Sequence, residues 1–346
     1  MNDPLIDELR SVPLWRDYQP TPLIELPEAA HAARVGRVFA KIEADRPIGN
    51  FKVLGGVLAG LRALARDTGA GTIDRLMNGR VDLPLPRLLC ASDGNHGLAV
   101  ATAARCAGTA ASIYLPASVS PIRCARIRAA GAEVVTVQGT YDDAVEQALA
   151  AARSGAGLLI ADTTDDQADR VVQDVMDGYG LLSRETSRQF ASLGLRPSHL
   201  FVQAGVGGLA ASMAKEFRPH MSDPAYIVVV EPASAACVRA ALAAGHPVRI
   251  QGDLATSAEM LSCGQASAPA VRILLQAEAA SLLVDDAAMA SAVRLLSACS
   301  GRGSTPSGAA GLAGLCAVAS DDTWRAAHGL SRDSTVLLVV SESQAA

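Results

Sequence analysis

The stretch Pro-Ile-Gly-Asn-Phe-Lys-Val-Leu-Gly-Gly, residues 47–56, joins a strand-like run to a helix-like run at Lys52. Lys52 is one of only three lysines beside 27 arginines, and its sequence neighbours are apolar residues and glycines. Burial disfavours a charged ammonium, lowers its pKa and makes the amine a nucleophile for a carbonyl. We therefore expect Lys52 to be a reactive lysine that can form a Schiff base.

The composition restricts the class of protein. A chain of 346 residues can bury a large core, and its length predicts two lobes. Half of the residues are hydrophobic but only 3% are aromatic, which favours close packing of helices on sheets through small side chains. The net charge of −5 argues against a nucleic-acid partner. The sequence has no signal-like start and no apolar run of membrane-spanning length, so we expect a cytoplasmic protein that binds no membrane.

Neither the cysteines nor the histidines follow a ligand pattern. The seven cysteines contain no CxxC, and the six histidines contain no HExxH. An odd number of scattered cysteines does not indicate a disulfide framework. We expect most cysteines to act as small hydrophobic residues, and we expect no metal site.

Short apolar runs alternate with longer helical stretches over most of the chain. This alternation predicts an α/β protein with parallel sheets covered by helices, which binds ligands at the carboxyl ends of its strands. The weakly periodic segments 67–86 and 248–270 are expected to be surface loops, and the second has a functional loop as an equal alternative. The expected strands are 38–44, 88–91, 112–115, 133–137, 158–161, 200–203, 226–230 and 335–340, and the expected helices are 51–66, 97–107, 122–130, 142–153, 208–217, 287–299 and 307–319.

Three glycine-containing turns lie where an expected strand gives way to a helix. They are residues 47–52, the Ser-Asp-Gly-Asn-His-Gly turn at 92–97, and the Ala-Gly-Val-Gly-Gly-Leu turn at 204–209. Unpaired backbone N–H groups and the helix dipole make such turns good sites for anions. Two of them could therefore hold a ligand phosphate and a substrate carboxylate.

The third turn has an alternative interpretation. Residues 205–210 match the relaxed dinucleotide pattern G-x-G-x-x-A, and Glu231 ends the next strand, where an acidic residue would meet a ribose. This interpretation predicts a nicotinamide-dependent (NAD) oxidoreductase. It leaves the other two turns without a role.

Taken together, the three turns resemble the fold type II family of pyridoxal-phosphate enzymes, which includes threonine dehydratase, serine racemase, cysteine synthase and the tryptophan synthase β subunit. The resemblance implies a tryptophan synthase β-like fold of two lobes, each with a mainly parallel sheet flanked by helices, and a homodimer. The expected larger lobe comprises residues 1–86 and 164–346. The expected smaller, mobile lobe comprises residues 87–163, carries the 92–97 turn and closes over the substrate.

The resemblance also implies roles for individual residues. Lys52 would form the Schiff base with pyridoxal 5'-phosphate, and Asn95 would lie beside the ring hydroxyl of the cofactor. Ser341 would meet the ring nitrogen. The cofactor phosphate would be bound by Gly205, Val206, Gly207, Gly208 and Leu209, and the amino-acid substrate by Ser92, Asp93, Gly94, Asn95 and His96.

Within the family, the sequence is most similar to the diaminopropionate ammonia-lyase branch. That branch shares the FKxLGG pattern that begins at Phe51, the aspartate at Asp93, the Tyr-Asp-Asp stretch at 141–143 and an aspartate like Asp162. The similarity implies elimination of ammonia from D- or L-2,3-diaminopropionate to give pyruvate. Lys52 and Asp93 would remove the α-proton from opposite faces, and Asp162 would orient or protonate the leaving amine.

Departures from that branch keep alternatives open. Gln265 replaces an expected glutamate, and the stretch 304–309 lacks another. A serine or threonine dehydratase, a β-replacement enzyme of the same fold and a relative that only binds cofactor are therefore alternatives. Structural roles also compete: Asp93 could cap a helix, Asp162 could belong to a turn, and His96 could form a structural hydrogen bond.

Overall fold

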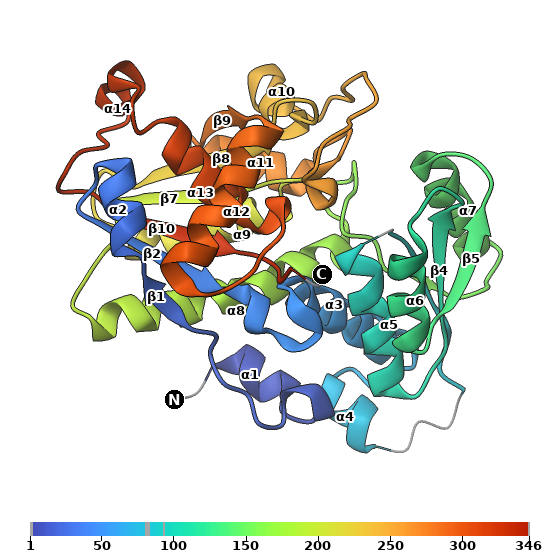
Figure 1. Cartoon of the computed structure of the whole chain (residues 1–346). Helices are drawn as coiled ribbons and strands as arrows, with labels where there is room; N and C mark the ends of the chain where they lie inside the picture. The colour runs from blue at the N-terminus through green and yellow to red at the C-terminus, as the bar shows by residue number, and fades with distance from the viewer. Residues whose placement is uncertain (1–2, 80–83, 93, 345–346) are drawn as a thin grey trace. The chain divides into compact units, whose positions relative to one another are not determined.

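The computed structural model describes residues 3–79, 84–92 and 94–344 (Figure 1). The chain divides into two compact units, each of which is described by itself. Unit 1 comprises Met1–Gln19, Lys52–Asp162 and Asp169–Leu181, and unit 2 comprises Pro20–Phe51, Thr163–Ala168 and Leu182–Ala346.

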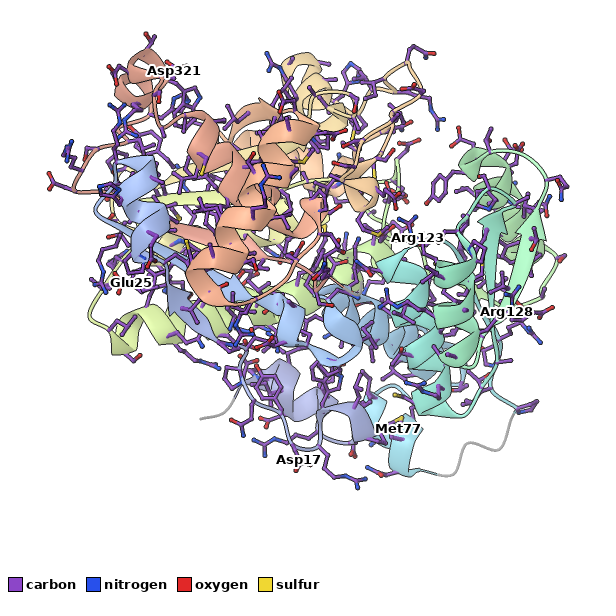
Figure 2. All side chains as sticks on the ribbon, viewed as in Figure 1. Asp17, Glu25, Met77, Arg123, Arg128 and Asp321 are labelled. Carbon is purple, nitrogen blue, oxygen red and sulfur yellow. The ribbon has the colours of Figure 1, made fainter. Side chains whose placement is uncertain are left out.

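Unit 1 is built on a four-stranded parallel sheet in the order β5-β4-β3-β6. Helices follow its strands in the alternation that the sequence predicts, and the exposed Arg128 projects from α6 (Figure 2). The strands are β3 (Leu88–Ala91), β4 (Ala111–Pro116), β5 (Glu133–Val137) and β6 (Leu158–Leu159), and the helices are α1 (Pro4–Leu9), α3 (Lys52–Asp67), α4 (Ile73–Asn78), α5 (Asn95–Ala107), α6 (Pro121–Ala129), α7 (Tyr141–Arg153) and the first half of α8 (Arg170–Ser192).

Helix α3 packs against both α5 and α8 through two adjacent glycines. A Cβ atom at Gly55 would lie 2.5 Å from the carbonyl oxygen of Val175 and 2.6 Å from the ring of Tyr179, both on α8. A Cβ atom at Gly56 would lie 2.6 Å from the Cβ of Ala99 on α5. The Gly-Gly pair of FKVLGG therefore lets two different helices approach the first turn of α3.

Unit 2 is built on a six-stranded sheet in the order β1-β2-β10-β7-β8-β9, in which β1 pairs antiparallel with β2 and the other pairs are parallel. The strands are β1 (Leu23–Glu25), β2 (Arg37–Ile42), β7 (His199–Gln203), β8 (Tyr226–Pro232), β9 (Ala280–Val284) and β10 (Thr335–Val340), and the helices are α2 (Pro27–Ala33), α9 (Gly208–Phe217), α10 (Cys237–Ala244), α11 (Ala268–Gln276), α12 (Asp286–Ser300), α13 (Pro306–Ala317), α14 (Asp322–Ala327) and the rest of α8.

Small residues let α13 lie close to the sheet of unit 2. A Cβ atom at Gly311 would lie 2.8 Å from the carbonyl oxygen of Phe201, and one at Gly314 would lie 2.5 Å from the side chain of Val230. Phe201 and Val230 belong to a core of buried apolar residues that also includes Leu338. The abundance of small residues in the sequence thus becomes close contact between helix and sheet.

A buried group of four charged side chains in unit 2 anchors the segment that precedes Lys52. Lys41 of β2 contacts Glu185 of α8 at 2.6 Å, and Arg46 contacts Glu43 at 2.8 Å and Glu185 at 2.7 Å. The four side chains are at most 1% exposed. Removal of one partner would leave a buried charge uncompensated, which typically costs about 3–5 kcal/mol.

The α/β class with two mainly parallel sheets is confirmed, and several element bounds agree with the expected ones. The expected segments 88–91, 133–137, 335–340 and 208–217 coincide with β3, β5, β10 and α9. Helix α8 was not among the expected elements, and its interior residues Gly178 and Gly180 have low helix propensity. The expected loop 67–86 contains the short helix α4, and the expected loop 248–270 contains the start of α11. No helix among the described residues is long and apolar enough to cross a membrane.

The compact units have other bounds than the expected lobes, and the division into lobes stays a prediction. Unit 1 contains residues 87–162 of the expected smaller lobe, but it also contains α3 and residues 170–181 of α8. The glycine contacts of α3 with α5 and α8 explain why these helices cluster with the four-stranded sheet. Independent movement of residues 87–163 stays a prediction.

Replacement of Gly55 by alanine should destabilise the protein. A glycine-to-alanine change in a helix interior ordinarily stabilises it by about 0.5–1 kcal/mol, but here the added methyl would meet a backbone oxygen that cannot move alone. We expect a net loss of about 1–3 kcal/mol, measured by urea denaturation. Gly60→Ala on the same helix is the comparison variant: its Cβ would lie 2.8 Å from the Cβ of Ala103 and 3.1 Å from the side chain of Leu88, close contacts that involve no backbone atom of another helix. A loss for Gly55→Ala no larger than that of the control would contradict the close crossing.

Candidate functional site

An ion pair between Lys52 and Asp162 forms the centre of the candidate site in unit 1. Lys52 is the first residue of α3, and Asp162 follows β6. The Nζ atom of Lys52 lies 2.6 Å from Oδ2 of Asp162, with the two side chains 20% and 15% exposed. Burial is the largest single influence and by itself would raise the pKa of Asp162, but the charge of Lys52, its hydrogen bond and the smaller lowering effects together hold that pKa well below its usual range. Asp162 is therefore an ionised carboxylate beside the lysine amine.

His96 lies behind this ion pair. Its Nε2 atom is 3.0 Å from the carbonyl oxygen of Ile160, an acceptor, so the hydrogen of the neutral ring is assigned to Nε2. Its Nδ1 atom lies 4.0 Å from Oδ2 of Asp162 and has no hydrogen-bond partner among the described residues. Burial lowers the pKa of His96, which keeps the imidazole neutral at pH 7.

Tyr179 of α8 also borders the lysine, and the sequence analysis did not identify it. The Nζ atom of Lys52 lies 5.9 Å from the centre of the Tyr179 ring. Burial raises the pKa of the Tyr179 phenol to about 12, against the opposing effect of the Lys52 ammonium. The phenol is therefore neutral near Lys52. Its signal in the sequence was weak, because it lies between Gly178 and Gly180 in a helix that was not expected.

The expected substrate turn connects β3 to α5. The N–H of Gly94 donates to Oγ of Ser92 at 3.4 Å, and Asn95 is buried at the start of α5. A Cβ atom at Gly97 would lie 2.7 Å from the carbonyl oxygen of Ser92, which explains the second glycine of the turn. Asp93 lies outside the described residues, so its role as a base or as a helix cap stays a prediction.

The glycine turn of unit 2 leads from β7 into α9. Gly207 has a φ of +93°, a conformation that favours glycine, and no side chain of the described chain caps the helix that starts at Gly208. The N–H of Ser267 donates to the carbonyl of Val206 at 2.9 Å. The buried Oγ of Ser267 has no hydrogen-bond partner within the described ranges. The turn therefore combines an uncapped helix start with an unused hydroxyl, which suits an anion.

Ser341 directly follows β10 in unit 2 and is buried. Its Oγ accepts a hydrogen bond from Nε2 of Gln203 at 2.8 Å. Its carbonyl oxygen accepts from the N–H of Phe51 at 3.1 Å, so the residue before Lys52 is tied to the end of β10. Gln203 is a second residue that the sequence analysis did not identify, because glutamine at the end of a strand carries no specific signal.

Glu231 does not have the role that the dinucleotide interpretation requires. Its Oε1 accepts from the N–H of Val238 at 2.7 Å, and its Oε2 accepts from the N–H of Arg239 at 2.8 Å. Both carboxylate oxygens thus hold the start of α10, and burial raises the pKa of Glu231 to about 7. The acidic residue expected for a ribose is used inside the protein.

The predicted site residues fall into two groups. Unit 1 brings together Lys52, Asp162 and His96, and unit 2 contains the 205–209 turn and Ser341. Within the part of the chain that the structure describes, no cluster of three or more His, Cys, Asp or Glu side chains could hold a metal ion.

Comparisons with known proteins agree with one another. A family model described as pyridoxal-phosphate dependent enzyme matches residues 14–342. The diaminopropionate ammonia-lyase of Escherichia coli (strain K12) is 29% identical over 338 residues, covering 94% of this chain and 84% of that protein. The diaminopropionate ammonia-lyase of Salmonella typhimurium (strain LT2) is 32% identical over 294 residues, covering 82% and 72%. A crystal structure of the Escherichia coli enzyme in complex with an aminoacrylate-PLP azomethine reaction intermediate has a TM-score of 0.84 at 26% identity, covering 100% and 91%.

Replacement of Asp162 by asparagine should make the cofactor-free protein less stable in a pH-dependent way. Because the folded-state pKa of Asp162 is depressed, its contribution is fully present above the unfolded pKa of about 3.9 and is lost as pH falls from there toward the lower folded-state pKa. We expect Asp162→Asn to lose about 1–3 kcal/mol at pH 7, with the difference from the parent protein narrowing below pH ~4. Urea denaturation at several pH values measures this.

Asp177→Asn is the control for that experiment, since Asp177 also forms an ion pair, with Arg62, but its side chain is 52% exposed. It should change stability by less than about 0.5 kcal/mol. A loss for Asp162→Asn that is constant between about pH 7 and pH 3 would show that the ion pair is not its cause.

Proposed function

We propose that this chain, which belongs to the family of pyridoxal-phosphate dependent enzymes, is an ammonia-lyase that converts 2,3-diaminopropionate in its D form, its L form or both to pyruvate and ammonia. The observation that carries the proposal is the contact of 2.6 Å between Lys52 and the ionised carboxylate of Asp162. The β-substituent of diaminopropionate is an ammonium group at neutral pH. A fixed carboxylate beside the reactive amine is complementary to that ammonium group. The hydroxyl of serine or threonine carries no charge that the carboxylate could attract.

The family and the fold class that the sequence indicated are confirmed, and the cofactor is pyridoxal phosphate. When bound, it supplies an aldehyde that joins an amine and a ring that accepts electrons from the substrate's Cα. The residues described above fit pyridoxal phosphate. We assign the aldehyde to Lys52, the phosphate to the uncapped turn 205–209 with the unused Ser267 hydroxyl, and the ring to Asn95 and Ser341.

The chain's own residues move the protons. Once a substrate amine has released Lys52, the Nζ atom of Lys52 removes the α-proton from one face of the substrate. We assign removal of the α-proton from the opposite face to Asp93. Asp162 holds the β-ammonium of the substrate through Oδ2 while the C–N bond breaks. The phenol of Tyr179 and the imidazole of His96 lie near the Lys52–Asp162 pair and are both neutral. They add no charge, so the carboxylate of Asp162 keeps its preference for a cation.

The overall balance is one diaminopropionate and one water to one pyruvate and two ammonia. The first ammonia is the β-amine: the β-ammonium leaves as neutral ammonia when its C–N bond breaks, and the α-proton stays on Lys52 or Asp93, whichever removed it. The second is released when the unsaturated product takes up water. The Ser92–Asn95 turn is assigned to the substrate carboxylate, because its backbone N–H groups open helix α5 and no side chain of the described chain caps that helix.

An elimination that releases the hydroxyl of serine or threonine, or a β-replacement, is the second candidate. The departures from the ammonia-lyase branch favour it. Gln265 replaces a glutamate and donates to Oδ1 of Asp165 at 2.5 Å, and Thr305 hydrogen-bonds to Glu342 in the stretch that lacks the other glutamate. Both contacts lie in unit 2, whereas the Lys52–Asp162 pair lies in unit 1.

We also propose a cytoplasmic homodimer, which the family resemblance supports. Light scattering after gel filtration should give twice the 35.5 kDa of one chain. Cell fractionation should recover the protein with cytoplasmic markers. A monomer mass would contradict the dimer.

Reduction with borohydride should attach the cofactor to Lys52. We expect a yellow protein whose visible absorption is bleached, with the added mass on the peptide that contains Lys52. Lys52→Arg should lose both, because an arginine forms no Schiff base with an aldehyde. Lys215→Arg, a change of an exposed lysine on α9, should keep both. A colourless protein, or label on Lys215, would contradict the assignment.

Asp162→Asn should lower kcat/KM for diaminopropionate about 10²–10⁴-fold, the usual range for loss of a positioned acid or base. The assay measures ammonia and pyruvate from D- and L-diaminopropionate and from D- and L-serine. Asp177→Asn on the same unit should retain parent activity. Parent-like turnover of diaminopropionate by Asp162→Asn, or turnover of serine alone, would favour the second candidate.

A further inference from the structure

The side-chain amide of Gln203 has an unusual hydrogen-bond distribution. Gln203 ends β7 and is 2% exposed. Its Nε2 atom lies 3.0 Å from the carbonyl oxygen of Val339, 3.2 Å from that of Gly308 and 2.8 Å from Oγ of Ser341. Its Oε1 atom is buried and has no hydrogen-bond partner among the described residues.

These contacts fix the orientation of the amide. Backbone carbonyls only accept hydrogen bonds, so the nitrogen of the amide faces Val339 and Gly308. The reverse orientation would place Oε1 against two other oxygens. The nitrogen of the amide is used three times, but its buried Oε1 is unused. The unused oxygen costs free energy that an apolar side chain of similar size would avoid. The arrangement therefore points to a need for the donor rather than for packing alone.

The same contacts fix the direction of the Ser341 hydroxyl. An amide nitrogen has no available lone pair, so Ser341 cannot donate to Gln203 and its Oγ must accept from Nε2. The hydroxyl hydrogen of Ser341 is then directed to another acceptor. The same amide nitrogen also donates to the carbonyl oxygens of Val339 and Gly308, and these two contacts hold it in place against Ser341.

We propose that Gln203 is a positioning residue that commits the Ser341 hydroxyl to donating a hydrogen bond to the ring nitrogen of the cofactor. The inference rests on the proposed function, in which Ser341 meets that nitrogen. Gln203 itself does not touch the cofactor. Its amide N–H takes up one acceptor position of the Ser341 oxygen, so the hydroxyl hydrogen points away from Gln203 and can be donated to an unprotonated ring nitrogen.

Gln203→Met tests the proposal because methionine has a similar length but no donor. Without the donated N–H, the Ser341 hydroxyl is no longer held with its oxygen toward residue 203 and is free to rotate, so the ring nitrogen loses its fixed donor. The protein is reconstituted with pyridoxal phosphate labelled with ¹⁵N in the ring, and the ¹⁵N chemical shift is measured. We expect Gln203→Met to move this shift in the same direction as Ser341→Ala.

Kinetics and the double variant separate positioning from loss of structure. We expect kcat to fall about tenfold in Gln203→Met, the effect of one lost hydrogen bond in the transition state, with KM little changed. Gln203→Met combined with Ser341→Ala should be no slower than Ser341→Ala alone, because both changes remove the same interaction. Ser341→Thr keeps a hydroxyl and should keep the parent ¹⁵N shift while Gln203 is present.

If methionine is poorly tolerated at this position, as judged by far-UV circular dichroism, Gln203→Asn replaces it. The shorter amide should lose contact with Ser341 and give the same change in the ¹⁵N shift. A parent-like shift in either folded Gln203 variant, together with a moved shift in Ser341→Ala, overturns the role of Gln203 and leaves the proposed function intact. An unmoved shift in Ser341→Ala overturns both the Gln203 role and the Ser341 assignment. Failure of the labelled cofactor to attach to Lys52 contradicts the proposed function itself.

Discussion

The crossing of α3 and α8 at glycines is the constraint on which unit 1 depends. A Cβ atom at Gly178 would lie 2.5 Å from the carbonyl oxygen of Leu54, and one at Gly55 would meet the backbone of α8 at a similar distance. Farther along the two helices, the buried Asp174 pairs with Arg62 at 3.0 Å and Arg66 at 2.6 Å. Contacts at two levels therefore fix the rotation and the separation of the helices, and with them the position of Lys52 at the start of α3.

The side chains that lie near Lys52 come from three different segments. Asp162 comes from the chain just after β6, His96 from the first turn of α5 and Tyr179 from α8. Of these three side chains, only Asp162 carries a charge, since burial keeps the imidazole and the phenol neutral. A site with one lysine and one carboxylate can exchange the lysine for a substrate ammonium without a net change of charge. That exchange is the physical basis on which we favour a diamino acid.

Unit 2 supplies groups of a different kind. The glycine turn, Gln203 and Ser341 are neutral groups at the carboxyl ends of β7 and β10, where parallel strands leave room for a ligand. The four buried charges around Glu185 hold the segment that leads to Phe51, and Phe51 is tied to Ser341. The unit 2 residues with proposed roles are therefore neutral, whereas the residues proposed for proton transfer belong to unit 1.

The sequence by itself determined the alternation of strands and helices, the three glycine turns and the candidate lysine, because period, turn chemistry and short motifs are local properties. It also indicated the family, which the comparisons confirm. Only the tertiary structure decided which groups meet. Asp162 lies 110 positions after Lys52, Gln203 lies 138 positions before Ser341, and Tyr179 belongs to a helix that was not among the expected elements. The same structure removed Glu231 from the ligand set by using both of its oxygens to hold α10. Contacts of this range depend on how strands and helices pack, and local sequence patterns do not contain that information.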